Sequence, residues 1–598
     1  MHIKSSIWKD VRTYLALQYR KFFYQLPCHF PTIEYKVKDH LSMEWIFHSG
    51  DKLFIISIMK KRRNVLYRKI AKITVLILGS VILLLVLIVC SAYLFTFLQK
   101  PLFVNKSLKL TNQLAIPQLL NPTTHNGKKV YDLTLQKGTK AFLIGKKTQT
   151  WGISGNYLGP VIRMHTGDTV EMHVTNNLGT KTTMHWHGME LPALMDGVYQ
   201  IIKPDTTWNP YWTVTNQAAT LWYHPHLMGS TGEQVYKGLG GMIIVDDKNS
   251  DKLNLPKQYG IDDIPVIVQD RIFDQNGQFV YKHVTDWLLG PLGFHGNTIL
   301  VNGTYAPYKD VPHGWIRLRL LNASNGRRYN FGFSDNRSFY QIATDGGFLE
   351  TPVKETRVEL APAERAEILV DMSDATPTTL MSYSVTDTMA NPSFLINLRA
   401  MLLNLYESIV RTDTDTNQKF KILALHPTSA VGDTTPIPQR LTTIHRWTEK
   451  DAVKVRKFSL NKEAMINKKK MNPAYINEIV YKDDVELWEI SNPAPGFHPF
   501  HIHDTQFLIL DRNGKPPAPS ERGWKDTVFV NWGDTVRILV RFTNNTDPHR
   551  PYMYHCHILE HEDMGMMGQF VVVNKDTPKS DIFVQKEYID EYKALPMN

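Results

Sequence analysis

Histidines separated by a single residue are the feature of this 598-residue chain most able to do chemistry. Successive side chains of a β-strand point to opposite faces, so the two histidines of such a pair share a face and can converge on a metal ion. Taken alone, such a pair is more often two partly buried histidines with ordinary hydrogen bonds. Four pairs occur here, at His185/His187, His224/His226, His501/His503 and His555/His557.

Imidazole side chains that converge from several segments suit copper. No accompanying set of carboxylates indicates magnesium, calcium or manganese, and zinc remains possible for a subset of the histidines. A second constellation favours copper: Cys556 is followed by His561 and Met566, and His498 lies in the preceding segment. Two histidines, a cysteine and a weak axial methionine form the blue-copper electron-transfer site. By spacing alone, Met566 is equally well explained as a core residue.

Cys556 is the only cysteine beyond residue 90, because the other two are Cys28 and Cys90. No disulfide can therefore form in the large C-terminal part, and a lone thiol there indicates a reactive or metal-bound group; an inert buried cysteine is the alternative. In a strand, Cys556 points away from His555 and His557, so it can hold one copper while they hold others. An electron would then cross between the two sites by a short covalent route.

The histidine pairs belong to a repeated unit. Residues 167–176 (GDTVEMHVTN) precede the pair His185/His187, and residues 484–492 (DVELWEISN) precede His501/His503. The continuations HPH (224–226) and HCH (555–557) also match, with proline in place of Cys556, which predicts a single blue copper. A third copy at residues 314–322 (GWIRLRLLN) is followed by no histidine pair, so we expect the middle unit to be structural.

Short runs rich in Val, Ile, Thr and Tyr, broken by Gly, Asn, Asp and Pro, fill the chain beyond residue 105. This texture is typical of an all-β sandwich protein. Polar stretches at residues 246–263 and 411–438 mark the boundaries between units. We expect three β domains at residues 106–248, 262–405 and 440–575, followed by a C-terminal tail at 576–598.

Residues 1–75 carry +10 of the net charge of +11. Residues 1–75 hold 15 Lys and Arg against 5 Asp and Glu, which leaves a net charge of only +1 on the rest of the chain. A nucleic-acid partner for the large C-terminal part therefore has no electrostatic support.

Residues 73–98 contain no charged side chain and are long enough to cross a membrane as a helix. Seven Lys and Arg between residues 60 and 72 precede this run, and cationic flanks stay on the cytoplasmic side. We expect a signal-anchor with residues 1–72 in the cytoplasm and the β domains outside. A cleaved signal peptide ending near Cys90-Ser91-Ala92 is the alternative, and a lipoprotein site at Cys90 is disfavoured by the bulky Val89.

Residues 1–58 show neither an amphipathic period nor strands punctuated by turns. Met59 and the four basic residues after it form a natural beginning for a signal-anchor, so we hypothesise that translation starts at Met59 rather than Met1. N-terminal sequencing of the native protein that began at Met1 would disprove this.

Four segments resemble the signature motifs of the multicopper oxidases: HWHG (185–188), HPH (224–226), HPFHIH (498–503) and HCHILEHEDMGMM (555–567). The similarity extends over roughly residues 110–575, and residues 255–271 and 513–528 look like the bacterial three-domain branch with its laccases, cuprous oxidases and bilirubin oxidases. The resemblance implies three cupredoxin-like Greek-key β-sandwich domains. It also implies four copper ions and a reaction in which four one-electron oxidations of a substrate are coupled to reduction of dioxygen to water.

Position by position, the resemblance assigns ligands to three types of copper. The type 1 copper would take His498, Cys556, His561 and Met566. The type 2 copper would take His185 and His501, and the type 3 pair would take His187, His224, His226, His503, His555 and His557. Asp196 and Glu562 match the carboxylates of the family that relay protons. By spacing alone, a turn-forming Asp and a solvated Glu are equally good explanations.

The electron donor is either a small molecule or a metal ion. Family members specialised for Cu(I) carry a methionine-rich insert and acidic or Met residues just before HPFHIH. Here residues 492–497 (NPAPGF) offer neither, and Met381, Met389 and Met401 are too thinly spread. We therefore favour a laccase-like oxidase of phenols over a cuprous oxidase. A copper-free cupredoxin scaffold of the cell envelope and a copper store are the alternatives from other classes.

Overall fold

The computed structural model describes residues 33–39, 42–49, 52–59, 76, 79–80, 83, 108–281, 293–385, 419–461, 464–494, 496–593 and 595. The chain divides into two compact units, Met1–Tyr93 and Leu94–Asn598, which are described separately.

The first unit contains an antiparallel sheet of three strands, β1 (Ile33–Asp39), β2 (Ser42–Ser49) and β3 (Lys52–Met59). The expectation of no strands in residues 1–58 is therefore wrong. Only two residues separate successive strands, and apolar residues alternate clearly along β1 only, so the periodic signal in this segment is weak. The hypothesis of a start at Met59 stays a prediction.

The predicted membrane span at residues 73–98 lies outside the described residues, apart from four helical positions, Leu76, Gly79, Ser80 and Leu83. None of the helices in the described part of the chain combines the length and the hydropathy that a membrane crossing requires. The span stays a prediction from hydropathy.

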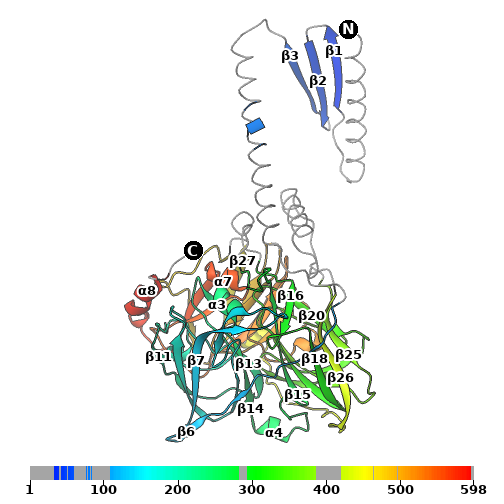
Figure 1. The fold of residues 1–598 in the computed structure, drawn as a ribbon. Helices are drawn as coiled ribbons and strands as arrows, with labels where there is room; N and C mark the ends of the chain where they lie inside the picture. The colour runs from blue at the N-terminus through cyan, green and yellow to red at the C-terminus, as the bar shows by residue number, and fades with distance from the viewer. Residues whose placement is uncertain are drawn as a thin grey trace. The chain divides into compact units, whose positions relative to one another are not determined.

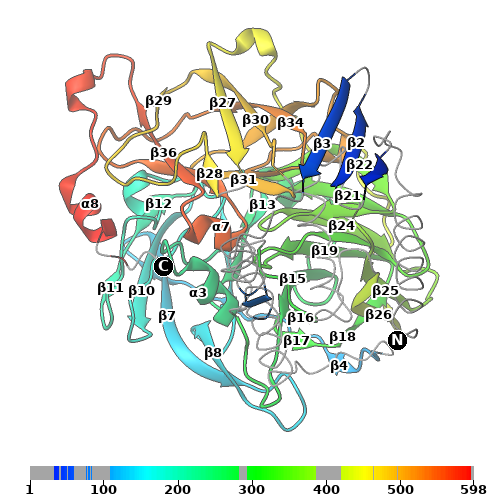
Figure 2. The same ribbon diagram turned by 90° about the horizontal axis from the view of Figure 1, so that it is seen from above.

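The second unit is built from three successive pairs of sheets (Figures 1 and 2). The strands of the first sandwich are β5 (Leu119–Leu120), β6 (Thr123–His125), β7 (Lys128–Lys140), β8 (Thr148–Ile153), β9 (Val161–His165), β10 (Thr169–Asn177), β11 (Thr207–Trp208), β12 (Tyr211–Thr213), β13 (Ala219–Tyr223) and β14 (Gly241–Asp246). One sheet has the order β11-β10-β7-β6, with β12 on β10 and β8 on β7, and the other has the order β13-β14-β9-β5. Apolar side chains from both sheets form one buried core.

The middle sandwich pairs a sheet of order β17-β16-β15-β19-β24-β21-β22 with one of order β23-β20-β25-β26-β18-β4 around its own core. Its strands are β4 (Asn112–Gln113), β15 (Asp263–Arg271), β16 (Thr298–Val301), β17 (Thr304–Tyr305), β18 (Pro307–His313), β19 (Trp315–Asn322), β20 (Tyr329–Phe333), β21 (Phe339–Thr344), β22 (Gly347–Glu355), β23 (Val358–Leu360), β24 (Arg365–Asp371), β25 (Thr378–Ser382) and β26 (Phe420–Val431). Strand β4 precedes the strands of the first sandwich in the sequence, but it pairs with β18 in a sheet of the middle sandwich.

The third sandwich pairs sheets of order β28-β27-β30-β34-β32 and β29-β36-β35-β31-β33 around a third core. Its strands are β27 (Lys454–Asn461), β28 (Met465–Ile466), β29 (Glu478–Tyr481), β30 (Val485–Ser491), β31 (His498–Ile502), β32 (Phe507–Arg512), β33 (Thr527–Val530), β34 (Thr535–Arg541), β35 (Tyr552–Cys556) and β36 (Met567–Val573). Its core includes Cys556 and Met566.

A buried asparagine at the end of one strand shows that the three sandwiches are copies of one unit. Asn176, Asn322 and Asn492 each accept a hydrogen bond from the backbone N–H two residues later, at 3.0 to 3.1 Å. Each side-chain amide also donates to two backbone carbonyls, at 2.8 to 3.1 Å. The same buried polar turn, satisfied in the same way, confirms that the middle unit is a third copy.

The helices within residues 108–595 that the structure describes are few and short: α3 (Thr231–Lys237), α4 (Lys248–Lys252), α7 (Leu559–Asp563), α8 (Lys586–Lys593) and the 3-10 turns η1 (Ala193–Met195), η2 (Glu449–Asp451), η3 (Pro519–Glu521) and η4 (Lys579–Asp581). The carboxylate of Asp563 in α7 accepts hydrogen bonds from the N–H groups of Thr231 and Gly232 in α3, at 2.8 and 2.9 Å. This contact joins the first and third sandwiches, and the two helices lie side by side in Figure 2.

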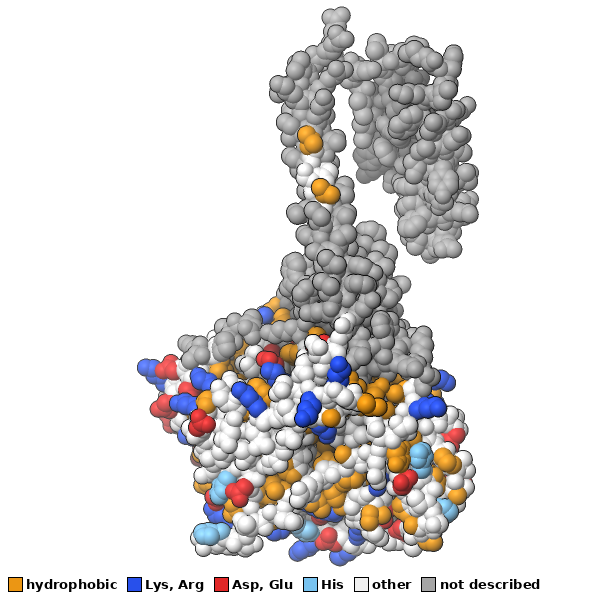
Figure 3. Space-filling model, in the orientation of Figure 1, with side chains coloured by type: hydrophobic (Ala, Val, Ile, Leu, Met, Phe, Trp, Pro, Cys, Tyr) orange, Lys and Arg blue, Asp and Glu red, His pale blue; other side chains and the backbone are white. Residues whose placement is uncertain are grey.

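The described part of the predicted C-terminal tail (576–598), residues 576–593 and 595, packs on the body of this unit. Tyr592 of α8 and Leu595 are buried against Tyr199 of the first sandwich and Met553 of the third. Basic and acidic side chains are intermixed over the face of the described region drawn in Figure 3, as the near-neutral composition beyond residue 75 predicts.

Strand β27 offers a matched test of the third core. Phe458 is buried in that core, whereas Val455 on the same strand is 55% exposed. Phe458→Ala should lower the free energy of unfolding of the third sandwich by about 3–5 kcal/mol, because it removes a core ring and leaves a cavity. Val455→Ala should change it by less than about 0.5 kcal/mol. Urea denaturation of the copper-free protein measures both, and equal effects would show that the core is misplaced.

Candidate metal centre

Strand pairing places the histidines of the two outer sandwiches in equivalent ways. In the third sandwich, the register of β31 with β35 sets His501 opposite His555. In the first sandwich, His185 and His224 face each other in an isolated bridge, and their N–H groups donate to each other's carbonyls at 2.8 and 3.1 Å. The sequence repeat is therefore also a repeat of histidine positions.

Eight buried histidines meet between the first and third sandwiches and form three groups. Within each group the candidate ligand atoms lie within 4.8 Å of one another. The groups are His185 with His501 and His503, His187 with His224 and His557, and His226 with His503 and His555. Each group draws on both sandwiches, so neither sandwich could form the centre alone.

A shared strand face would allow both histidines of a pair to bind one metal ion, but the structure divides three of the four pairs between groups. Only His501 and His503 fall in one group; the others divide between groups. His185 lies in an isolated bridge, and β13, β31 and β35 all end before the second histidine of their pairs, so strand alternation does not extend through any of the four pairs.

Hydrogen bonds to oxygen atoms fix the protonation of the imidazole rings. A carbonyl or ionised carboxylate oxygen only accepts, so the ring nitrogen that contacts it must carry the proton. The Nδ1 atoms of five histidines make such contacts, at 2.8 to 3.1 Å: His185 with Asp196 O, His224 with Pro225 O, His501 with Asp526 O, His503 with Asp196 Oδ2 and His555 with Cys556 O. The Nε2 atom of each neutral ring is left with an unshared lone pair.

Two of these lone pairs face each other. Nε2 of His503 lies 3.2 Å from Nε2 of His555, and neither atom has a proton to donate to the other. Burial, with the neighbouring histidines, lowers the pKa of both rings well below the usual value, so protonation does not relieve the contact. A cation bound between the two nitrogens would relieve the contact. Imidazole nitrogens bind zinc at about 2.0–2.1 Å, so two that share an ion are roughly 3–4 Å apart, which this contact matches.

The pKa is lowered in the same way in most of the candidate histidine ligands. Burial is the largest cause, and nearby imidazoles add to it, so the pKa is lowered well below its usual value in His187, His224, His226, His498, His501, His503, His555 and His557. Metal ligands must be unprotonated imidazoles, so these residues are prepared to bind a metal at neutral pH.

His187 is oriented the opposite way by a residue that the sequence did not reveal. Its Nε2 lies 3.0 Å from Oδ1 of the buried Asp526, and its Nδ1 lies 3.5 Å from Nε2 of His224. Asp526 comes just before β33, within the segment GWKDTV that carried part of the family resemblance. An acidic residue directly before the short apolar strand β33 was the available signal.

A second candidate metal site, formed by His498, Cys556, His561 and Met566, lies beside the histidine centre. Sγ of the buried Cys556 is 3.4 Å from Nδ1 of His498 and 3.6 Å from Nδ1 of His561. Met566 is buried next to them: its carbonyl accepts from the Cys556 N–H at 3.1 Å, and its N–H donates to the His561 carbonyl at 2.9 Å. Burial raises the pKa of the Cys556 thiol, so a thiolate here requires a neighbouring cation.

Both predicted proton-relay carboxylates lie at the histidine centre. Asp196 accepts from His503 with Oδ2, and its Oδ1 lies 3.2 Å from Nδ1 of His185. The oxygens of Glu562 lie 3.5 Å from Nδ1 of His226 and of His555. Glu562 is fully buried, so the alternative of a solvated Glu is wrong.

Asp196 does also shape the turn that the sequence suggested. It ends η1 (Ala193–Met195) and is followed by Gly197 at φ 80°. A Cβ on Gly197 would lie 1.7 Å from the Met184 carbonyl, so only glycine allows the turn to approach the segment before His185.

Comparison with known proteins agrees with these sites. Residues 134–250 and 433–576 match two domain families, both described as multicopper oxidase. The chain is 37% identical over 467 residues to the multicopper oxidase mco of Staphylococcus aureus, covering 77% of this chain and 92% of that protein. It is also 36% identical over 475 residues to the cell division protein FtsP of Photorhabdus laumondii, covering 79% of this chain and 95% of that protein.

Among solved structures, the chain is similar to CueO, a laccase-like multicopper oxidase from Ochrobactrum sp. The TM-score is 0.68 at 32% identity, over 77% of this chain and 100% of that one. A laccase from Pediococcus acidilactici is similar at a TM-score of 0.67 and 33% identity, over 79% of this chain and 97% of that one. The three β-sandwiches thus have the cupredoxin-like fold of these enzymes, and the chain belongs to the multicopper oxidase family.

Proposed function

We propose that the protein is a copper-dependent oxidase that couples one-electron oxidation of a phenol-like donor to reduction of dioxygen to water. The observation that carries the proposal is the facing pair of imidazole nitrogens on His503 and His555, a contact that a bound cation would relieve. Four copper ions, bound at the Cys556 site and at the histidine centre, would supply the one-electron oxidation of the donor and the four-electron reduction of dioxygen.

The residues divide among the copper types as their grouping suggests. His498, Cys556, His561 and Met566 would hold the type 1 copper. His185 and His501, whose Nε2 atoms have no hydrogen-bond partner among the described residues, would hold the type 2 copper. Of the type 3 pair, one ion would take His187, His224 and His557 and the other His226, His503 and His555.

The backbone joins the two groups directly. Cys556 stands between His555 and His557, so the thiolate and two cluster imidazoles belong to three consecutive residues. This is a path of covalent bonds between the place where a donor would be oxidised and the place where dioxygen would be reduced. Pro225 holds the matching position in the first sandwich, so only one type 1 site can form.

Asp196 and Glu562 are placed to supply the protons that water formation consumes. Asp196 contacts His185 and His503 of one group, Glu562 contacts His226 and His555 of another, and both carboxyls are almost completely buried. Asp196 holds His503 through one oxygen and keeps the other beside His185.

A phenol-like donor is favoured over Cu(I) by the absence of soft or charged side chains in residues 492–497. Met381 is buried in β25, which supports a packing role; Met389 and Met401 lie outside the described residues. Cuprous oxidase in copper tolerance is the second candidate, since a relative with the name CueO is among the similar structures.

A copper-free scaffold is the alternative from another class, and the similarity to FtsP proteins gives it a basis. Overall identity does not discriminate, because the oxidase and FtsP relatives match at 37% and 36%. The complete set of buried ligands favours the oxidase. We further propose a single-pass anchor at residues 73–98, with the three β domains outside the cytoplasm. The predicted bounds of these domains were 106–248, 262–405 and 440–575, but β26 (Phe420–Val431) pairs within the middle sandwich, so the middle domain extends beyond residue 405.

An oxygen electrode tests the function directly. The copper-loaded protein should consume oxygen with a phenol, more slowly with Cu(I), and release no hydrogen peroxide. Faster turnover of Cu(I) would favour the cuprous oxidase. Bound copper without oxygen consumption would indicate a copper store, and no copper after reconstitution would indicate a scaffold.

Replacement of Cys556 by serine separates the two groups. Cys556→Ser should abolish the blue absorption and reduce donor oxidation to the background rate, because a hydroxyl replaces the soft ligand. The electron paramagnetic resonance signal of the type 2 copper should remain, because His185 and His501 are unchanged. A variant that stayed blue would show that Cys556 is not a copper ligand.

Asp196→Asn tests proton delivery. It should slow oxygen reduction by about 10²–10⁴-fold, the usual contribution of a general acid, while the blue absorption persists. Asparagine keeps the size of the side chain and an oxygen that can accept from His503. Stopped-flow reoxidation of the reduced protein measures the step, and loss of the blue absorption would instead assign Asp196 a structural role.

A further inference from the structure

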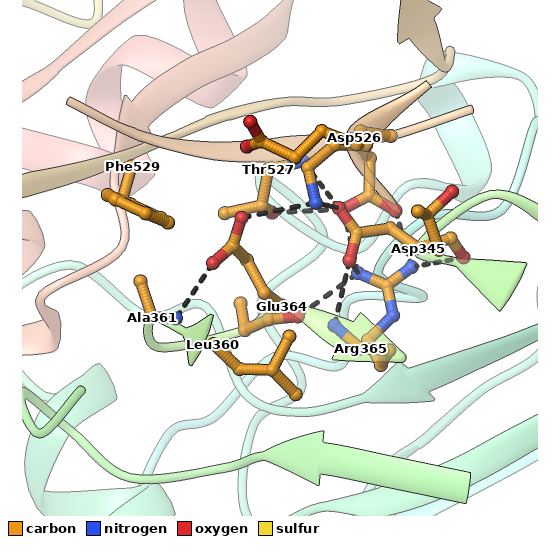
Figure 4. Close-up of polar contacts among 12 residues, drawn as sticks. Asp345, Leu360, Ala361, Glu364, Arg365, Asp526, Thr527 and Phe529 are labelled. Carbon is orange, nitrogen blue, oxygen red and sulfur yellow. Dashed lines mark hydrogen bonds and ion pairs between the residues drawn. The ribbon is translucent and has the colours of Figure 1, made fainter. Parts of the chain in front are cut away.

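The middle sandwich supplies none of the candidate ligands, yet one of its side chains reaches the histidine centre. Arg365 begins β24 and is fully buried. Its Nη1 and Nη2 donate to Oδ1 and Oδ2 of Asp526 at 2.8 and 2.5 Å, as Figure 4 shows. This two-pronged ion pair links the middle sandwich to the start of β33 in the third.

Asp526 in turn holds two histidines from different sandwiches. Its Oδ1 accepts from Nε2 of His187 at 3.0 Å, and its backbone carbonyl accepts from Nδ1 of His501 at 2.8 Å. Thr527 donates to the same Oδ1 at 2.9 Å. The carboxylate therefore decides which nitrogen of His187 carries the proton and which one faces His224 and His557.

Every N–H of the Arg365 guanidinium has a partner. Besides the two bonds to Asp526, Nε donates to the Thr220 carbonyl at 2.9 Å, Nη1 to Ala363 at 3.0 Å and Nη2 to Asp345 at 2.9 Å. These five donors are all that an arginine possesses, and they lie in one rigid plane. Thr220 belongs to β13, the strand that leads to His224, so the guanidinium bonds to all three sandwiches.

A glycine marks how closely the ion pair approaches the ligands. Gly188 follows His187 and has φ 86°. A Cβ at this position would lie 2.6 Å from Oδ2 of Asp526 and 3.0 Å from Nη2 of Arg365. The ion pair thus fills the space directly beside the backbone of His187, which gives a physical reason for the glycine of the HWHG segment.

Lys525 forms buried ion pairs next to the Arg365–Asp526 pair. Lys525 lies 2.9 Å from Oδ2 of Asp345 and 3.1 Å from Oε1 of Glu364, the residue before Arg365. The other oxygen of Glu364 accepts from the N–H of Ala361 at 2.7 Å, and Asp345 Oδ1 accepts from the N–H of Arg365 at 2.7 Å (Figure 4). Residues 364–365 and 525–526 are therefore fixed to each other at two adjacent points.

We propose that Arg365 is a positioning residue of the trinuclear copper site: by clamping Asp526, it fixes the tautomer and the orientation of His187. This inference rests on the proposed function only in taking His187 as a copper ligand. The competing explanation is an ion pair that merely joins sandwiches. The two differ because a clamp acts through His187, whereas a joint would affect only stability.

Arg365→Lys tests the clamp, because lysine keeps the charge but loses the planar fork. Copper binding at the trinuclear site should weaken by about 10- to 100-fold, the usual loss when a residue that orients a metal-ligating histidine is changed. The blue absorption should remain, because His498, Cys556 and His561 do not contact Arg365 among the described residues. Competition with a chelator of known affinity measures the copper binding, and paramagnetic resonance reports on the type 2 site.

Arg319→Lys is the matched control. Arg319 is equally buried in the same sandwich and makes a two-pronged ion pair with Asp263, at 2.7 and 3.0 Å. None of its carboxylate partners contacts a histidine of the centre within the described part of the chain. Arg319→Lys should keep the wild-type copper affinity. Equal affinities in the two variants, whether lowered or unchanged, would overturn the proposal.

If Arg365→Lys does not fold, Asp526→Asn removes the same ion pair with almost no change in volume and should weaken copper binding by a similar factor. Oxygen consumption by the wild type tests the proposed function separately: copper binding without turnover would defeat that function and leave the clamp standing.

A measurement on copper-free protein covers the case of a wild type that takes up no copper. Arg365→Lys and His187→Gln, made singly and together, should be non-additive in the urea midpoint, because they disturb one connected network. Additive midpoints would show that Arg365 does not act on His187.

Discussion

Unprotonated imidazole nitrogens that face one another in a buried space are the constraint on which this structure depends. Hydrogen bonds to Cys556 O and to Asp196 leave His555 and His503 with lone pairs directed at each other, and burial prevents either ring from taking up a proton. Without a cation the arrangement is unfavourable. Packing of the surrounding fold holds the two rings in this unfavourable contact. Metal binding would therefore increase the free energy of unfolding of the protein.

Duplication explains how a β protein can build such a centre. Two copies of one unit present bridged histidine pairs, His185 with His224 and His501 with His555, from surfaces that meet. Each of the three groups in the histidine centre takes members from both copies, so that centre exists only where the two sandwiches associate. The middle sandwich keeps the buried asparagine turn but has no histidine pair. Its contribution is a guanidinium that reaches the carboxylate behind His187.

The sequence predicted those parts of the protein that are written as local patterns. The all-β class followed from short runs and turns, and the ligand set followed from spacing and from the repeat. The division of the histidines into groups did not follow, because it depends on how the two sandwiches meet. Asp526 and Arg365 are 161 residues apart in the chain, and no local pattern couples them. The sheet at residues 33–59 was missed because its strands are short and apolar residues alternate clearly in only the first of them.

The most direct test of the central claim is a crystal structure of the copper-loaded protein, with anomalous scattering recorded on both sides of the copper absorption edge. Copper peaks are expected between His226, His503 and His555, between His187, His224 and His557, beside His185 and His501, and beside Cys556. Absence of a peak between His503 and His555 in protein that contains copper elsewhere would contradict the account.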